Sequence, residues 1–166
     1  MFRRGRARVQ PDDDPSWSKY PQTILEMLDD RSLAIDLRQE IGAETRRTLS
    51  QHGFGAGFVV LTAWNPLGRS TDHATNRERD RTLRAWLGKR HIHWAPADGV
   101  SPDRQHREEG VAAVMSVGAG RELAMRYEQS AIYAYDGAII WLLGALVSTP
   151  PLPLPAHTPR GSSERR

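Results

Sequence analysis

The alternation of apolar and polar positions predicts several β-strands along this chain of 166 residues. Leu33, Ile35 and Leu37 are each followed by a polar or small residue, which is the period of a strand with one buried face. Residues 58–61 form a continuous apolar run, which is typical of a central strand covered on both faces. Further strands are predicted at residues 91–94, at 111–117 and in a closing hairpin over 131–143.

Apolar residues at helical spacing predict three or four helices between these strands. The longest covers about residues 72–89, where Ser70 or Thr71 is placed to cap the first turn. The other helices are expected within 17–30, over 43–51 and from 118 to 128. Residues 96–110 are polar and are expected to form a loop. The whole pattern predicts the α+β (α/β) class, with a mixed sheet of about five or six strands.

The two ends of the chain differ in composition from its middle. Residues 1–16 form an arginine-rich arm that continues into an aspartate run, and residues 149–166 are rich in proline, then in serine and arginine. Segments of this composition bury too little apolar surface to fold alone, so we expect both to be disordered. The predicted organisation is therefore a disordered arm over 1–16, a single domain over 17–148 and a disordered proline-rich tail.

The net charge of +3 is carried by these two ends. Residues 1–10 contain four arginines and no acidic residue, and the last sixteen residues add a charge of +2, so residues 11–150 sum to −3. A domain that binds nucleic acid would carry its basic excess within the fold. This distribution leaves the N-terminal arm as the candidate contact with nucleic acid.

Composition and motifs exclude several classes of chemistry. The chain has no cysteine, which rules out a disulfide scaffold, a cysteine-ligated zinc site, an iron–sulfur cluster and a thiol nucleophile. It has no Gly-x-Ser-x-Gly elbow and no Walker-type phosphate loop, and we expect no cofactor. The longest apolar run, residues 138–147, is too short to cross a bilayer, and no secretory signal precedes the aspartate run. A cytoplasmic location is expected.

The apolar face of the helix predicted over 72–89 becomes polar toward its start. Its apolar residues are Leu83, Trp86 and Leu87. Steps of three and four residues back along the same face reach Arg79 or Asp80, and then Asn76. Polar side chains that continue a core-facing stripe must find hydrogen-bond partners or line a wet cleft.

We interpret this polar stretch as one wall of a ligand-binding cleft beyond the end of the strand at 58–61. The candidate ligand-binding residues are Thr62, Asn65, Arg69, Asn76, Arg79 and Gln129. Glu109 is the candidate catalytic base, since it is the carboxylate among the polar residues considered. The alternative is a purely structural polar network, in which Asn65 stabilises the turn before Pro66 and Gln129 caps the preceding helix. Both interpretations stay open at this point.

Two histidines have a spacing that suits a metal site. His91 and His93 lie two residues apart in a predicted strand and point to the same side, where His106, Glu108 or Asp98 could complete a zinc shell. The alternative is that Ile92 and Trp94 pack inward while both histidines face water; the alternation alone explains that arrangement.

Three stretches resemble a known family. They are the run LTAWNP at residues 61–66 with Asn76 on the next helix, the loop 99–103 with Glu109, and the run YEQSAI at residues 127–132. In this order they resemble the bacterial domain of unknown function 3293 family, over about residues 33–143. The resemblance implies a small α/β bacterial or phage protein and implies no activity.

A binding module fits these candidate residues better than a catalyst. Amides and a hydroxyl form hydrogen bonds without titrating, so we expect a non-catalytic protein that binds a small polar or anionic ligand, for example a nucleotide, or a protein partner. One alternative is a hydrolase- or transferase-type enzyme that uses Glu109. The other is nucleic-acid binding through the arginine-rich arm. No membrane partner is expected, and the pattern does not fix an oligomeric state.

Overall fold

The computed structural model describes residues 8–157, which form nine strands, three α-helices and three short 3-10 turns. The strands are β1 (Ile24–Met27), β2 (Leu33–Asp36), β3 (Phe58–Thr62), β4 (Trp94–Val100), β5 (Arg107–Glu108), β6 (Gly110–Ala113), β7 (Ala131–Tyr135), β8 (Ile140–Gly144) and β9 (Leu152–Leu154). The helices are α1 (Ala43–Gln51), α2 (His73–Lys89) and α3 (Val117–Arg126). The turns are η1 (Pro11–Asp13), η2 (Trp17–Gln22) and η3 (Pro66–Gly68). The α+β class predicted from the sequence is confirmed.

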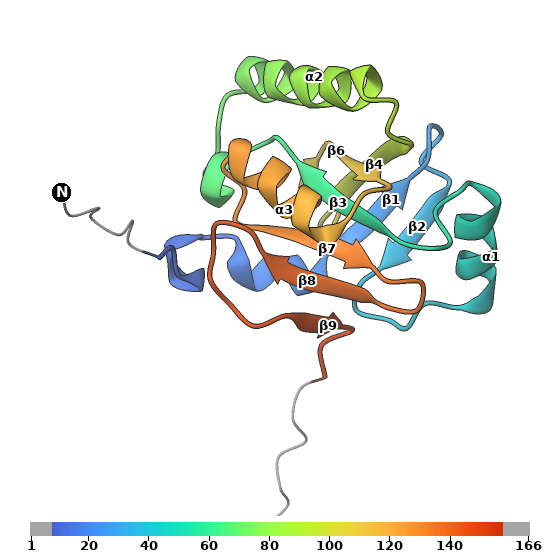
Figure 1. The fold of residues 1–166 in the computed structure, drawn as a ribbon. Helices are drawn as coiled ribbons and strands as arrows, with labels where there is room; N and C mark the ends of the chain where they lie inside the picture. Colours follow the sequence, from blue (N-terminus) through green and yellow to red (C-terminus); the bar gives the residue numbers. More distant parts are fainter. Residues whose placement is uncertain (1–7, 158–166) are drawn as a thin grey trace, which may run out of the picture.

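All nine strands belong to one curled sheet (Figure 1). Its order is β2-β1-β4-β6-β3-β7-β8-β9, with β5 paired to β4, and all of these strand pairs are antiparallel. Leu25 and Ile35, near one end of this order, share a buried core with Ile140 and Leu154 at the other end. The sheet curls because apolar side chains of both its ends pack into the same interior.

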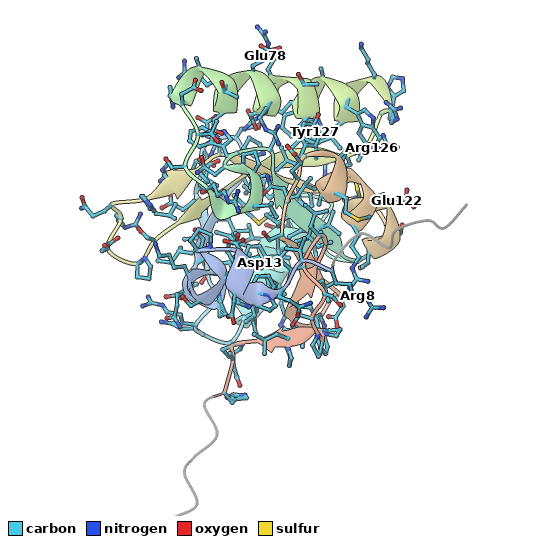
Figure 2. All side chains as sticks on the ribbon, turned by 90° about the vertical axis from the view of Figure 1, so that its left-hand side faces the viewer. Arg8, Asp13, Glu78, Glu122, Arg126 and Tyr127 are labelled. Atoms are coloured by element: carbon cyan, nitrogen blue, oxygen red, sulfur yellow. The ribbon has the colours of Figure 1, made fainter. Side chains whose placement is uncertain are left out.

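Helices α2 and α3 cover the outer face of the central strands (Figure 1). Leu83 of α2 and Leu123 of α3 are buried in a second apolar core with Val59 and Val111, which lie on β3 and β6. Exposed Glu78 points away from the sheet on the outer side of α2 (Figure 2). The central strand β3 is therefore covered on both faces, as its continuous apolar run predicts.

The N-terminal helix predicted within residues 17–30 is wrong. Residues 17–22 form η2, and residues 24–27 form β1, which lies between β2 and β4 in the sheet. Pro21 stands where a continuing helix would need a backbone N–H donor. Leu25 and Met27 are buried by pairing with two neighbouring strands, and that burial outweighs the helical spacing of this segment.

The strand predicted at residues 91–94 starts only at residue 94, and it extends into the segment predicted to be a loop at 96–110. β4 starts at Trp94, after His91, whose backbone φ of 53° does not suit a strand. β4 runs on to Val100 because it pairs with β1 on one side and β6 on the other. β1, β5 and β9 raise the number of strands above the five or six predicted, and the sheet is antiparallel where a mixed one was expected.

Other predicted elements match closely. The helix over 43–51 and the hairpin of β7 and β8 lie where the pattern placed them. The cap of α2 is Asp72, whose side chain accepts a hydrogen bond from the backbone N–H of Thr75, so neither Ser70 nor Thr71 caps this helix. No helix within residues 8–157 is both long enough and apolar enough to cross a membrane.

Both ends of the described chain take part in the fold, where disorder was expected. Val9 forms a bridge with Val147, and β9 pairs with β8. Asp14 is buried, and the side chain of Leu154 is buried in the inner core. The disorder predicted over 1–16 and 149–166 is thus wrong for residues 8–16 and 149–157, while the rest of both predictions falls outside the described residues.

Candidate functional site

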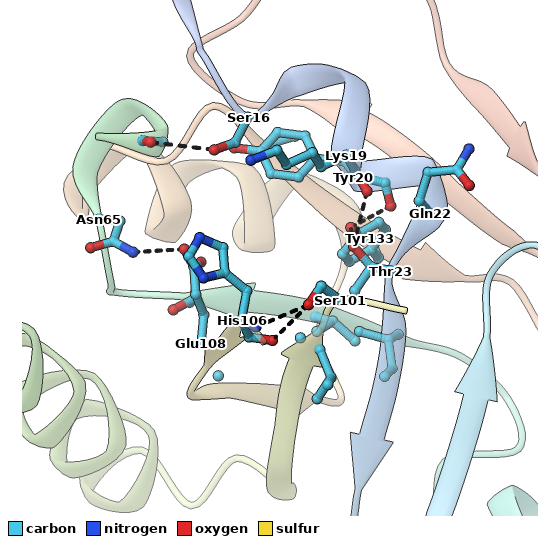
Figure 3. Close-up of a pocket in the computed structure, with 18 of the residues that line it drawn as sticks. Ser16, Lys19, Tyr20, Gln22, Thr23, Asn65, Ser101, His106, Glu108 and Tyr133 are labelled. Carbon is cyan, nitrogen blue, oxygen red and sulfur yellow. Dashed lines mark hydrogen bonds between the residues drawn. The ribbon is translucent and has the colours of Figure 1, made fainter. Parts of the chain in front are cut away.

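The curled sheet holds a cavity of about 600 Å³ at one end of its central strands (Figure 3). The turn η2 lines one side of the cavity, and the loop between β4 and β5 lines another. The walls between them are mostly apolar: Leu25, Val60, Val100, Ile132 and Leu142 contribute from five different strands. Such a volume and lining are typical of a site for a small molecule.

Glu108 brings a carboxyl group to the wall of this cavity. β5 pairs Glu108 with Gly99 of β4, which fixes its position in the sheet. Its Oε1 accepts a hydrogen bond of 2.7 Å from Nδ2 of Asn65 (Figure 3). Burial raises the pKa of Glu108; the bond from Asn65 and the charge of His106 oppose this rise, and Asp14 adds to it. The site thus holds a carboxyl group whose charged form is disfavoured.

Asn65 is held in place by a second amide, that of Asn76. The two side chains bond to each other at 2.9 Å, and Oδ1 of Asn76 accepts from the backbone N–H of Asn65 at 2.9 Å. Thr71 also contributes, with its N–H donating to Asn65 and its carbonyl accepting from Asn76. Asn65 has a left-handed backbone, with φ of 45°, which asparagine tolerates better than most residues. The network therefore fixes the amide that orients Glu108.

The N-terminal segment supplies a second polar group of the cavity. The hydroxyl of Tyr20 donates a 2.5 Å hydrogen bond to buried Asp14, which also accepts from the backbone N–H of Ser16. The hydroxyl of Tyr133 donates to the carbonyl oxygen of Tyr20 at 2.8 Å and lies 3.1 Å from Oγ1 of Thr23. Burial raises the pKa of both tyrosines, so both phenols are protonated over the ordinary pH range.

The loop between β4 and β5 is anchored to the outer face of the sheet by ion pairs. Arg107 bonds to Glu26 at 2.8 Å and to Asp98 at 2.9 Å, and Arg31 bonds to Asp98 at 3.0 Å. Arg104 adds a bond of 2.5 Å to Glu26. Arg104 in this loop and Arg107 directly after it are thereby tied to β1 and β4, next to His106 and Glu108.

The structure brings together only some of the predicted ligand-binding residues. Thr62, Asn65 and Gln129 line the cavity. Asn76 is buried behind Asn65 and lines a smaller cavity of about 190 Å³ that shares Asn65, His106 and Glu108 with the large one. Thr62 and Gln129 also have structural partners: the Thr62 hydroxyl donates to a backbone carbonyl, and Gln129 Nε2 donates to two. The same residues therefore line a cavity and take part in a structural hydrogen-bond network, so both interpretations of the sequence remain open.

The two predicted arginines lie outside this cavity. The Arg79 guanidinium donates to the carbonyl oxygens of Ala63 at 2.7 Å and Tyr127 at 2.5 Å, so it joins α2 to the ends of β3 and α3. Arg69 is exposed and does not line either cavity. Neither placement supports the ligand-binding role predicted for these residues.

The predicted carboxylate is displaced by one residue. Glu109 does not line either cavity, and its charge acts on Asp80 of α2, on the outer side of the sheet. Neighbouring residues in extended chain point to opposite faces, so Glu108 occupies the inward position instead. The candidate acid of the site is Glu108.

The two histidines considered as metal ligands are both exposed and lie in different surroundings. His91 precedes β4 in a left-handed conformation, whereas Nε2 of His93 lies 2.8 Å from the carbonyl oxygen of His52, and its ring packs on Phe54. Within residues 8–157, no group of three or more acidic or histidine side chains is placed to hold a metal ion.

Sequence reasoning missed the N-terminal contribution altogether. Asp14 and Tyr20 lie in segments predicted to be a disordered arm and a helix, and Tyr133 was assigned only to a hairpin. A usable signal was the burial expected of the aromatic residues Trp17 and Tyr20, which pack against the inner core. Their positions in a segment interrupted by prolines hid that signal.

Part of the chain matches a known family. Residues 61–132 match the family model described as Protein of unknown function (DUF3293). This confirms the resemblance over the middle of the range predicted from the sequence. No curated protein and no solved structure matches the chain. The DUF3293 match contains Asn65, Asn76, Glu108 and Gln129, whereas Tyr20 lies outside it.

Proposed function

We propose that this protein binds a small molecule with an apolar body and a polar head in the cavity beside Glu108. The single observation that carries this proposal is the Glu108 carboxyl group, which lies in a mostly apolar cavity and is oriented by the Asn65–Asn76 pair. A half-buried, oriented acid in a concave and largely apolar pocket is a recurrent feature of binding sites.

A comparison with neighbouring carboxyl groups supports a functional role for Glu108. Glu26 and Asp98 are more buried than Glu108, but each has two arginine partners. Glu108 has a neutral amide as its bonded partner and keeps a raised pKa, which is unfavourable for the fold at neutral pH. Functional sites commonly retain groups of this kind at a cost in stability.

The shape of the site favours a compact ligand over a polymer. The cavity volume of about 600 Å³ suits a molecule of cofactor or metabolite size. Its apolar strand residues would contact the ligand body, and Glu108, Asn65 and Tyr20 would contact the head. The nucleic-acid role predicted for the arm concerns residues that are for the most part outside the described part of the chain.

The test is a binding screen with a variant that fills the cavity. Amphipathic fragments are titrated into the full-length protein, and amide shifts are followed by ¹H–¹⁵N NMR. Ala131→Leu adds a larger side chain at the cavity wall and is expected to weaken binding at least about tenfold, since the space for the ligand body is lost. Ala85→Leu, at an exposed position of α2, is the matched control and should leave binding unchanged.

Two results would contradict this proposal. One is the absence of any fragment that shifts amides around the cavity. The other is binding that is equally strong in both leucine variants. The NMR spectrum of each variant also reports whether it keeps the native fold.

The raised pKa of Glu108 supports a second candidate function, an enzyme in which this carboxyl acts as a general acid. This candidate function replaces the hypothesis from the sequence in which Glu109 is the catalytic base. A carboxyl that keeps its proton to higher pH can donate it to a bound substrate. Glu108→Gln would then abolish turnover of a bound molecule while leaving its binding largely intact.

A further inference from the structure

Three polar side chains that line the cavity donate their hydrogen bonds to other groups of the protein. The hydroxyl of Thr62 donates to the carbonyl oxygen of Glu109, and the Tyr20 hydroxyl donates to Asp14. Nε2 of Gln129 donates to the carbonyl oxygens of Trp64 and Tyr127, which uses both hydrogens of its amide group. The polar groups that these three side chains still offer to a ligand are therefore acceptors.

Acceptor atoms remain on three of these side chains. Glu108 uses Oε1 for Asn65, which leaves Oε2 for a ligand. The phenol oxygen of Tyr20 keeps its lone pairs after donating its proton, and Gln129 keeps its carbonyl oxygen. A ligand head that donates several hydrogen bonds would satisfy this arrangement, whereas a head that only accepts would not.

The charges around the cavity lead to the same conclusion. Glu108 lines it, and buried Asp14 lies close enough to act on Glu108 electrostatically. Among the lining residues that the structure describes, the basic ones are Lys19 and His106, and both are exposed. The cavity therefore has the Glu108 carboxyl group in its wall, the buried Asp14 carboxyl group nearby, and no buried basic residue among the described residues that line it.

We propose that the head of the ligand is a protonated amine, which binds the Glu108 carboxylate while the apolar body packs against the strands. This inference rests on the proposed function and names the ligand class for the same cavity. An ammonium group supplies up to three donors and a positive charge, and its hydrogen bonds to a carboxylate are stronger than those of a neutral head. It would also offset the burial of the Glu108 charge, which otherwise keeps the pKa of this group high.

Three probes that share one apolar body separate this inference from its alternatives. Tryptamine, tryptophol and indole-3-propionate carry an ammonium, a hydroxyl and a carboxylate on the same indole ring. Each is titrated into the full-length protein at pH 7.5 and followed by ¹H–¹⁵N NMR. We expect tryptamine to bind at least about tenfold more tightly than tryptophol, with amide shifts around Glu108 and Tyr20, and indole-3-propionate to bind most weakly.

A pair of variants tests whether Glu108 itself recognises the amine. Glu108→Gln keeps the size of the side chain and removes its charge, so tryptamine should lose its advantage while the affinity for tryptophol changes by less than about threefold. Glu109→Gln removes a carboxylate one residue away that does not line the cavity, and tryptamine should bind it as it binds the native protein.

The outcomes distinguish this inference from the proposed function. Equal binding of tryptamine and tryptophol, or strongest binding of indole-3-propionate, overturns the amine and leaves a ligand-binding cavity. Tryptamine binding that survives Glu108→Gln also overturns it. If none of the three probes shifts amides of the cavity up to its solubility limit, the amine is overturned, and the fragment screen with Ala131→Leu decides the proposed function separately.

Discussion

Glu108 and Glu26 differ in the direction of their pKa shifts. Hydrogen bonds from Arg107 and Arg104 lower the pKa of Glu26, although burial opposes them. Burial instead raises the pKa of Glu108. Its bonded partner is the neutral amide of Asn65, which opposes this rise without reversing it. The two groups therefore contribute opposite pH dependences to the stability of the fold.

The first prediction concerns Glu108→Gln and stability. The folded-state pKa of Glu108 lies above the value in the unfolded chain, so its ionisation on raising the pH destabilises the native state. Asp14 adds to this rise in pKa, whereas the hydrogen bond from Asn65 and the charge of His106 favour the ionised form of Glu108. We expect Glu108→Gln to raise the free energy of unfolding at pH 7 and to leave it unchanged well below the ordinary glutamate pKa.

Urea denaturation at a series of pH values measures this effect. The increase in the free energy of unfolding caused by Glu108→Gln should appear as the pH rises from the ordinary glutamate pKa through the raised pKa of Glu108. Glu109→Gln, which removes the same charge outside the cavity, is the control and should show no such gain. A loss of stability in Glu108→Gln at pH 7 would contradict the assignment of a destabilised carboxylate.

The elements of this fold differ in how far the sequence could predict them. α1, α2, β3 and the β7–β8 hairpin carry strong local signals, because helical spacing, a fully apolar run or a turn at Asp136-Gly137 specifies each one. β4 contains Pro96, Asp98 and Gly99, which are poor strand formers, and it exists because β1 and β6 pair with it. Such long-range pairing leaves no local pattern.

The proline-rich segment around β9 is a similar case. Leu152 and Leu154 alternate with prolines, so the segment reads as an extended tail. It lies at the edge of the sheet, where one side needs no hydrogen-bonded partner, and a proline is tolerated there. Burial of the Leu154 side chain in the inner core holds β9 against the sheet.

The candidate site could be predicted only in part, for the same reason. Asn76 could be predicted because it interrupts the apolar face of a helix, and Thr62, Asn65 and Gln129 because they lie at the ends of predicted strands. The difference between Glu108 and Glu109 depends on the register of the two-residue strand β5, which follows from its pairing with β4. No local periodicity specifies that register.

The second prediction concerns the contact between η3 and the N-terminal segment. Gly68 has φ of 67°, and a Cβ atom there would overlap the carboxylate of Asp14. Gly68→Ala is therefore expected to lower the free energy of unfolding by roughly 1 kcal/mol or more, since the backbone and Asp14 must both move. It should also increase the mobility of residues 14–23. Gly88→Ala, in α2 with nothing within 4 Å of the added Cβ, should stabilise the protein by about 0.5–1 kcal/mol.

Thermal or urea unfolding of the two alanine variants provides this comparison, and hydrogen exchange locates the effect. Faster exchange in Gly68→Ala should be concentrated in the turn η2. Equal stabilities for the two variants would mean that the contact between Gly68 and Asp14 does not hold the N-terminal segment on the sheet.

The cavity is a property of the whole molecule, because no single element contains it. Curling of the sheet brings the start of β1, the ends of β3 and β4 and the start of β7 to one end of the inner core. The turn η2, from the beginning of the described chain, then covers one side, and the loop of residues 101–106 covers another. Residues 61–132, which match the family model, supply Glu108 and Asn65, and the N-terminal segment adds Tyr20.

This arrangement predicts that a bound ligand stabilises two segments that are distant in the sequence. With saturating tryptamine, amide hydrogen exchange should slow in residues 16–23 and in residues 101–108 together, because both segments contact the same occupant. Exchange in α2 should change little, since this helix covers the opposite face of the sheet. Mass spectrometry of proteolytic fragments measures all three regions in one experiment. Protection of only one of the two segments would mean that the ligand binds at the mouth of the cavity, and protection centred on α2 and α3 would place it on the other face of the sheet.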